Sequence, residues 1–184
     1  LDMVTPIMRS RAKAVNFGIV YGIGAFSLAK DIGVSNKEAK HYIESYLAHY
    51  SGVDSYMKNV VEKANADGYV ETMFGRRRNL PELTSSKHMI RAFGERVARN
   101  MPIQGTAADI IKIAMIKVDE RMKAENLRAR LVLQVHDELI VEAPQDESMR
   151  VALIVQEEME NAVKMSVPLT ADAAIGRTWY DAKG

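Results

Sequence analysis

The sequence contains no cysteine, and only one tryptophan, four phenylalanines and five prolines among its 184 residues. A chain without thiols has no disulfide scaffold, no Cys-ligated zinc and no thiol catalysis. No apolar run reaches the roughly 20 residues that a membrane span needs. Residues 1–11 show no apolar core behind a basic start, so no signal peptide is predicted. We therefore expect a cytoplasmic protein that does not contact a membrane.

The composition is otherwise that of an ordinary globular protein, with 47% hydrophobic and 27% charged residues. The length suits one domain or two small lobes. A net charge of +1 conceals asymmetry: residues 1–37 carry five basic and two acidic residues, residues 69–100 seven and three, and residues 137–161 one and eight. Two basic segments and an acidic one indicate a polyanion partner and a metal-binding carboxylate site, or simply solvated helix faces.

The pattern of turn residues and apolar periodicity predicts a helix-rich α+β fold with a small antiparallel sheet. Helices are expected at 6–21, 25–31, 36–50, 53–66, 86–101, 106–124, 145–163 and 177–182, with Pro102 interrupting the chain between the fifth and the sixth. Strands are expected at 69–74, 130–135, 138–143 and 167–175, and a basic loop after residue 75. Because only two residues separate the strands within 130–143, they are predicted to form a tight hairpin.

Four residues of the first predicted helix recur at a spacing of four: Arg9, Lys13, Phe17 and Tyr21. Successive members drift by only about 40° around a helix, so they share one face. Two cations one turn apart suit a chain of phosphates, and two aromatic rings can stack on a sugar or a base. The spacing alone fits equally well an amphipathic helix with Phe17 and Tyr21 in the core.

The string Arg-x-x-x-Lys-x-x-x-Phe-Gly-x-x-Tyr-Gly resembles motif B of the family A DNA polymerases, the bacterial DNA polymerase I type. The resemblance implies that a helix at about 5–22 grips an incoming deoxynucleoside triphosphate. Arg9 and Lys13 would hold the triphosphate, and Lys13 would act catalytically by countering charge on the transferring phosphoryl group. Phe17 would pack against the sugar and base, and Tyr21 would stack beside the nascent pair and the template.

A histidine and two carboxylates are adjacent at the predicted hairpin turn, in Gln-Val-His136-Asp137-Glu138. A two-residue turn demands positive φ, which His and Asp tolerate at a cost, and such strain favours a functional turn. The bare pattern also fits an exposed acidic turn that promotes solubility. The string resembles motif C of the same family. This implies that Asp137 is a catalytic ligand of two Mg²⁺ ions, that Glu138 supports catalysis and the metal site, and that His136 touches the primer backbone.

A third stretch, Glu95-Arg96-x-x-x-Asn100-x-Pro-x-Gln104-Gly-Thr-Ala-Ala-Asp109, resembles another segment of the family. Arg96 and Asn100 lie one helical turn apart and share a face. The resemblance implies that both follow the template, and that Gln104 reaches the minor groove near the primer terminus, where acceptors occupy similar positions in every base pair. Taken alone, Arg96 and Asn100 are surface residues and Gln104 is a loop residue.

Three consecutive arginines at 76–78 follow a glycine turn and also resemble the family. They predict contact with a phosphate backbone, whereas a solvated loop or a clamp on a neighbouring carboxylate are the alternatives. We assign no individual role to any of the three.

The resemblance runs from Met8 to Trp179, but nothing before Met8 supplies the family's motif A. It implies mostly fingers at 1–85 and mostly palm at 86–184. We therefore expect a C-terminal fragment of a DNA-directed DNA polymerase of replication and repair, working at the bacterial nucleoid. Its partners would be primer–template DNA, deoxynucleoside triphosphates and the missing N-terminal part of the same polymerase. The alternative is a DNA-binding module without catalysis, and a third hypothesis is a structural accessory domain.

Overall fold

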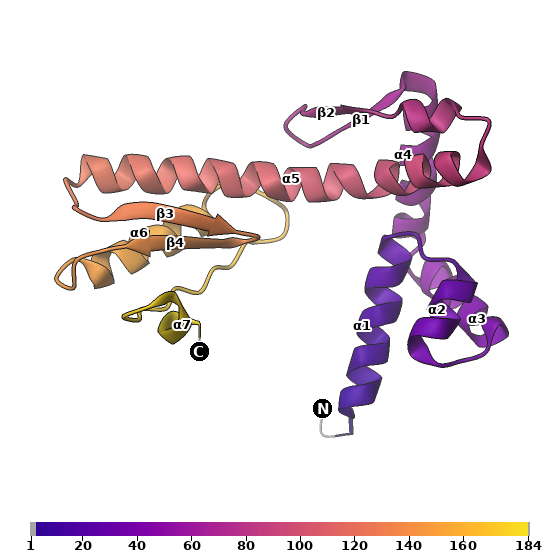
Figure 1. Cartoon of the computed structure of the whole chain (residues 1–184), viewed down its shortest axis with the longest axis horizontal. Helices are drawn as coiled ribbons and strands as arrows, with labels where there is room; N and C mark the ends of the chain where they lie inside the picture. The colour runs from indigo at the N-terminus through magenta and orange to yellow at the C-terminus, as the bar shows by residue number, and fades with distance from the viewer. Residues whose placement is uncertain (1–2, 184) are drawn as a thin grey trace. The chain divides into compact units, whose positions relative to one another are not determined.

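The computed structural model describes residues 3–183 and confirms the predicted helix-rich α+β fold (Figure 1). The chain divides into two compact units, residues 1–106 and 107–184, and the longest helix contributes residues to both. Among the residues that the structure describes, no helix is long and apolar enough to cross a membrane. The assignment of fingers to 1–85 and palm to 86–184 stays a prediction.

Four helices begin the first unit, and their ends follow the sequence signals. They are α1 (Pro6–Val20), α2 (Ala25–Ile32), α3 (Asn36–His49) and α4 (Ser51–Asp67). The Thr5 hydroxyl accepts a hydrogen bond from the Met8 amide, and Pro6 takes the first helical position. Ser35 and Glu38 form the capping box that opens α3. These caps satisfy amides that a helix start would otherwise leave unpaired.

A small hairpin follows α4, with strands β1 (Tyr69–Glu71) and β2 (Arg77–Asn79), and then a 3-10 turn, η1 (Pro81–Thr84). Val70 lies opposite Arg78, and Glu71 lies opposite Arg77. The prediction of a loop is therefore wrong for β2, and β1 is shorter than predicted. Consecutive arginines have no local preference for a strand, so β2 depends on cross-strand pairing with β1.

Helix α5 (His88–Ala124) runs unbroken through Pro102, so the predicted interruption is wrong. A proline inside a helix removes the hydrogen bond to the carbonyl four residues earlier and costs about 3 kcal/mol. Burial on both sides offsets that cost, because Ala98 is fully buried one turn before and Thr106 is 6% exposed one turn after. The Thr106 hydroxyl also donates to the Pro102 carbonyl at 2.5 Å.

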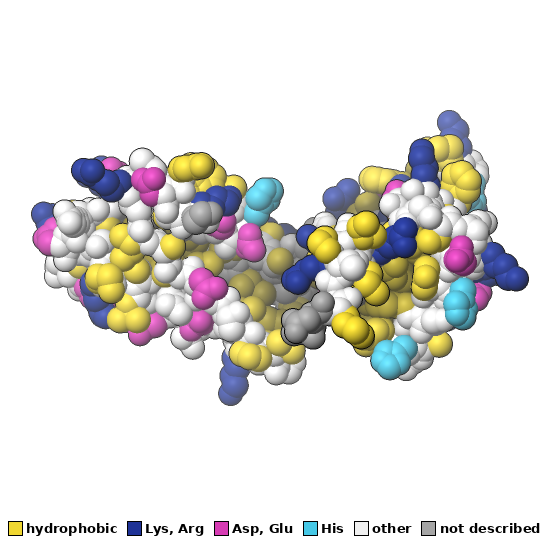
Figure 2. Space-filling view, turned by 90° about the horizontal axis from the view of Figure 1, so that it is seen from below, with side chains coloured by type: hydrophobic (Ala, Val, Ile, Leu, Met, Phe, Trp, Pro, Cys, Tyr) yellow, Lys and Arg dark blue, Asp and Glu magenta, His cyan; other side chains and the backbone are white. Residues whose placement is uncertain are grey.

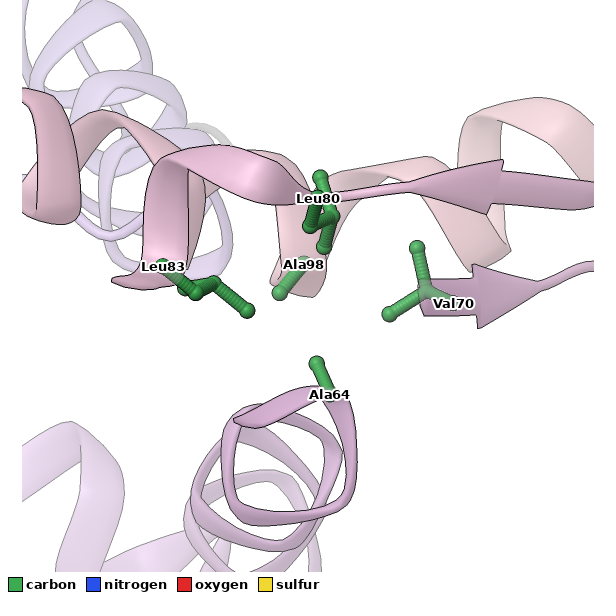
Figure 3. Close-up of a cluster of buried hydrophobic side chains, with 5 residues drawn as sticks. All are labelled: Ala64, Val70, Leu80, Leu83 and Ala98. Carbon is green, nitrogen blue, oxygen red and sulfur yellow. The ribbon is translucent and has the colours of Figure 1, made fainter. Parts of the chain in front are cut away.

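Two hydrophobic clusters hold the first unit together. One joins α2 to α3 around the fully buried Leu28 and Ala39. In the other, side chains from α4, β1, η1, the residue before η1 and α5 point toward one another (Figure 3): Ala64, Val70, Leu83, Leu80 and Ala98. Figure 2 shows that other hydrophobic side chains, in yellow, stay on the surface among the charged ones.

The second unit packs a hairpin and a helix against the last part of α5. Its elements are β3 (Arg130–Val135), β4 (Glu138–Glu142), α6 (Ser148–Glu160) and α7 (Trp179–Ala182). The core consists of Val118 and Met122 of α5 with Val151 and Ile154 of α6, and the hairpin residues Leu131, Leu139 and Val141 pack against it. The strands are antiparallel, with a β-bulge between Leu131 and Leu133. The predicted hairpin is confirmed.

The third strand predicted for this unit, at 167–175, is wrong, because these residues form no strand. Pro168 has no amide to donate, and the Ala171 amide donates to Glu160 Oε1 at 3.1 Å. Among the described residues, β3 and β4 pair only with each other. The helices predicted at 145–163 and 177–182 are observed as the shorter α6 and α7.

Candidate functional site

Helix α1 exposes its aromatic residues. Phe17 is 48% exposed and Tyr21, the C-cap residue, is 42% exposed, so the interpretation that places both rings in the core is wrong. The two rings stack with centroids 6.3 Å apart and 22° between their planes. Lys13 Nζ lies 5.8 Å from the Phe17 ring centroid, and Arg9 is exposed one turn earlier. The helix thus offers two cations followed by two stacked rings.

Gly22 allows the end of α1 to approach α5 closely. Its φ is +76°, and a Cβ at this position would lie 3.3 Å from Arg99 Nη1 and 3.9 Å from Arg96 Cγ. A larger residue would meet both the left-handed backbone and the Arg99 guanidinium, which is paired with Glu95 at 3.3 Å. The approach brings Arg96 beside the turn that carries Tyr21.

The unbroken α5 aligns three predicted DNA-binding residues. Arg96, Asn100 and Gln104 follow one another at intervals of one turn on one helix, so the alternative that places Gln104 in a loop is wrong. Arg96 and Gln104 are exposed. Asn100 is half-buried, and its Oδ1 has no hydrogen-bond partner among the described residues. An unpaired buried acceptor costs about 1–3 kcal/mol, which favours a partner from outside the chain.

Two threonines that sequence analysis missed tie the β1–β2 loop to α5. The Met73 amide donates to Thr106 Oγ1 at 3.0 Å. A Cβ at Gly105 would lie 2.7 Å from Thr72 Cγ2, so the glycine permits this close approach. The only signal in the sequence is the Gly-Thr pair after Gln104. Two residues of the family-like string therefore position the loop, while Gln104 itself remains exposed.

One of the three consecutive arginines is held within the β1–β2 hairpin. The Arg77 guanidinium lies 4.4 Å from the Tyr69 ring centroid, and its Nε donates to Glu71 Oε2 at 3.1 Å. Arg77 thus follows the alternative of a clamp on a neighbouring carboxylate. Arg78 is exposed on the same strand, and its contact with phosphate stays a prediction.

The β3–β4 turn carries the predicted carboxylates. His136 has a φ of 55°, as the two-residue turn demands, and its carbonyl accepts a hydrogen bond from Gln134 Nε2. Asp137 is exposed. Glu138 Oε2 is buried and lacks a hydrogen-bond partner among the described residues, with Lys183 Nζ 3.6 Å away. An orphaned carboxylate oxygen beside a second carboxylate suits a hard cation such as Mg²⁺.

An open groove of about 800 Å³ in the second unit begins at these carboxylates. Asp137 and Glu138 line it at the turn, Ile110 and Ala114 line it from α5, and Trp179 lines it from α7. Within residues 3–183 no three His, Asp or Glu side chains are grouped to hold a metal ion. The two carboxylates therefore fit Mg²⁺ chemically but do not complete a coordination shell.

Ion pairs fix α6, which helps to line this groove, against α5. The Arg121 guanidinium lies 2.7 Å from Glu157 and 2.8 Å from Glu158, and hydrogen bonds to these carboxylates raise its pKa. Arg150 binds Glu125 through two nitrogens. This hydrogen bonding, followed by that from Arg121, lowers the pKa of Glu125 against the opposing effect of desolvation.

The sequence matches the family model described as DNA polymerase family A over residues 1–181. The chain belongs to DNA polymerase family A. It is 56% identical over 182 residues to DNA polymerase I of Bacillus caldotenax and 53% identical over 182 residues to that of Bacillus subtilis. Each match covers 99% of this chain and 21% of the relative, so the chain spans about a fifth of their length.

A solved structure of the same family shares this fold. It is the POL domain of Pol1 from M. smegmatis in complex with DNA primer–template and dNTP. The two are 46% identical, the match covers 100% of this chain and 32% of that one, and the TM-score is 0.94. The predicted site residues of this family A chain therefore lie on helices and strands of a fold that it shares with that solved structure.

The ten predicted site residues of this family A chain fall into two groups by unit. The first unit holds the nucleotide-binding and template-following candidates: Arg9, Lys13, Phe17, Tyr21, Arg96, Asn100 and Gln104. The second unit holds the turn candidates His136, Asp137 and Glu138. Their individual roles stay predictions.

Proposed function

We propose that this chain supplies the nucleotide-gripping helix and the carboxylate turn of a DNA-directed DNA polymerase of replication and repair. The observation that carries the proposal is the exposed face of α1, where cationic side chains lead into the stacked rings of Phe17 and Tyr21. A triphosphate needs cations, and a base needs an aromatic surface. Membership of DNA polymerase family A supports the same function.

Different residues of α1 contact different parts of the incoming nucleotide. Arg9 offers a planar fork for two phosphate oxygens, and Lys13 offers a mobile charge that can follow the transferring phosphoryl group. Phe17 packs against the sugar and base. Tyr21 stacks beside the nascent base pair, and the Arg96 side chain of α5 lies close to the neighbouring Gly22.

The reaction is in-line attack of the primer 3′-hydroxyl on the α-phosphorus, with release of pyrophosphate. Asp137 and Glu138 would hold Mg²⁺, since they are adjacent oxygen ligands and Glu138 Oε2 has no hydrogen-bond partner among the described residues, with Lys183 Nζ as an ion-pair partner at 3.6 Å. Bound Mg²⁺ would activate the primer hydroxyl and stabilise the leaving pyrophosphate. His136, at the same exposed turn, would contact the primer backbone.

Primer–template DNA follows the Arg96–Asn100–Gln104 row of α5. Arg96 contacts template phosphate, and Asn100 offers a donor on the DNA its Oδ1, which has no hydrogen-bond partner within residues 3–183. Gln104 reads the minor groove without reading sequence. The remaining length of a family A polymerase is a further partner, which supplies the metal ligands that Asp137 and Glu138 lack. The cell compartment that we propose, the bacterial cytoplasm at the nucleoid, follows from this function.

The chain alone is expected not to extend primers, because two adjacent carboxylates do not complete the two-metal site. A chimera tests both parts of the proposal. The matched segment of this chain replaces the corresponding fifth of Bacillus subtilis DNA polymerase I, to which it is 53% identical over 182 residues. Primer extension with Mg²⁺ is measured for the chimera and for the chain alone.

The matched variants are Asp137→Ala and Asp119→Ala. Asp119 is a carboxylate of α5 that, among the described residues, pairs only with Lys123, and it lies outside the proposed site. We expect the chimera to extend primers, Asp119→Ala to retain that activity and Asp137→Ala to lose it. Full activity of a folded Asp137→Ala chimera would contradict the proposed metal ligand. Extension by the chain alone, lost in Asp137→Ala, would contradict its expected inactivity.

A further inference from the structure

A hydrogen bond connects the nucleotide helix α1 to α3 across thirty residues of sequence. The Tyr46 hydroxyl donates to Asn16 Oδ1 at 2.7 Å. Tyr46 is half-buried, and its ring packs on that of Tyr50 at 4.8 Å and 48°. The Tyr50 ring in turn meets His49 edge-on at 4.7 Å. These contacts fix the ring, and therefore the position of the hydroxyl.

Asn16 lies on the face of α1 that carries the cations. It follows Arg9 by seven residues, which is two helical turns less about 20°, and it follows Lys13 by three residues, which is one turn less about 60°. Its side chain is exposed. A ligand held by Arg9 and Lys13 therefore passes within reach of the Asn16 amide.

In the bond that the structure shows with Tyr46, the oxygen end of that amide faces the hydroxyl and the NH₂ end faces outward. An asparagine amide has one acceptor oxygen and an NH₂ group with two donors. Here Tyr46 engages the oxygen, and the NH₂ group has no partner among the described residues. Phosphate oxygens only accept hydrogen bonds, so an outward NH₂ group attracts them and an outward oxygen repels them. Without the tyrosine hydroxyl the amide is free to turn either way.

We propose that Tyr46 is a positioning residue for the nucleotide, and that it fixes the Asn16 amide so that its NH₂ group donates to the triphosphate. This inference rests on the proposed function of α1. It adds to that function a donor, Asn16, beside the two cations. It also gives α3, which carries none of the predicted site residues, a part in nucleotide binding.

The test is binding of dATP by the full 184-residue chain, labelled with ¹⁵N. Calorimetry gives the Kd, and NMR follows the Asn16 side-chain NH₂ signal. The variants are Tyr46→Phe, Asn16→Ala, the double variant and Lys13→Ala. Tyr50→Phe is the matched control, because it removes a hydroxyl from the neighbouring ring for which the described residues offer no hydrogen-bond partner.

We expect dATP to shift the Asn16 NH₂ signal in the wild type, and Tyr46→Phe to weaken binding about three- to tenfold. Tyr50→Phe should bind as the wild type does. In the Asn16→Ala background Tyr46→Phe should have no further effect on the Kd, which a merely structural role of Tyr46 would not produce. Thermal melts of each variant establish that it is folded.

The outcomes separate this inference from the function on which it rests. Binding that depends on Lys13 but is unchanged in folded Tyr46→Phe, with no shift at Asn16, overturns the role of Tyr46 and leaves the nucleotide helix in place. A wild-type chain that binds dATP no better than Lys13→Ala contradicts the proposed function of α1, and the inference falls with it.

Discussion

Replacing His136 tests whether the turn that carries the carboxylates holds backbone strain. Its φ of 55° lies in the left-handed region, and its side chain is exposed. A left-handed backbone costs an ordinary residue about 1–2 kcal/mol. Glycine avoids that cost. It also gives the unfolded chain more conformational freedom, however, which lowers the free energy of unfolding by about 0.4–1 kcal/mol.

We therefore expect His136→Gly to raise the free energy of unfolding by about 0.5 kcal/mol. His136→Val should lower it by about 1 kcal/mol, since a β-branched residue fits positive φ worse than histidine does. Urea unfolding of the second unit is followed by the fluorescence of Trp179, the single tryptophan of the sequence. Asn126→Gly makes the same kind of change at a φ of 54° outside the turn, so it is the control for the DNA-binding measurement.

Binding of primer–template DNA should behave differently, because both variants lose the imidazole. We expect His136→Gly and His136→Val to weaken binding equally although one is more stable and the other less. Fluorescence anisotropy of labelled DNA measures this, with Asn126→Gly unchanged. Equal stability of the glycine and valine variants would refute the strain, and binding that tracks stability would refute the direct contact.

Four further substitutions test the cores and charges described above. Leu80→Ala should lower the free energy of unfolding by about 3 kcal/mol, because Leu80 is 1% exposed within its cluster; urea unfolding by circular dichroism measures this, and a loss below about 1 kcal/mol would contradict it. Arg78→Ala should reduce the salt dependence of DNA binding by about one phosphate contact, whereas Arg77→Ala should change stability and leave that slope unchanged. Glu125→Gln should reduce the loss of protein stability that occurs as the pH falls into the acid range. Because hydrogen bonding from Arg150 lowers the pKa of Glu125, its contribution is present above the ordinary value of 4.5 and is lost as the pH falls through the lowered value. If the free energy of unfolding changed with pH in parallel for the wild type and the variant over this acid range, the prediction would be wrong.

Local chemistry explains why much of the fold could be predicted. The Thr5–Pro6 start of α1 and the Ser35–Glu38 box of α3 are short-range signals that need no tertiary partner. The β3–β4 hairpin follows from two apolar runs separated by two residues. The shared face of α1 follows from helical geometry alone, but exposure of Phe17 and Tyr21 could not be read from that spacing.

The errors arise where distant residues decide the local structure. Pro102 stays helical because the turns on both sides of it are buried, which local propensity does not reveal. Strand β2 forms because Arg77 lies over Tyr69 and pairs with Glu71. The segment 167–175 has an apolar pattern but no ladder to join. In the site, the bond between Tyr46 and Asn16 spans thirty residues and leaves no sequence signature.

The β-bulge in β3 makes the length of that strand matter to the carboxylate turn. Leu131 pairs with Val141 and Leu133 with Ile140, so Val132 has no opposite residue in β4. Leu131 and Val141 are packed against the α5–α6 core, and deleting Val132 would leave every pair in place but remove the bend and added twist that the bulge gives β3. Without that bend, the pairs from Leu133 onward would hold the turn at a different angle to the core. When related sequences are aligned, a one-residue gap in β3 therefore signals an altered site even where the histidine and both carboxylates remain.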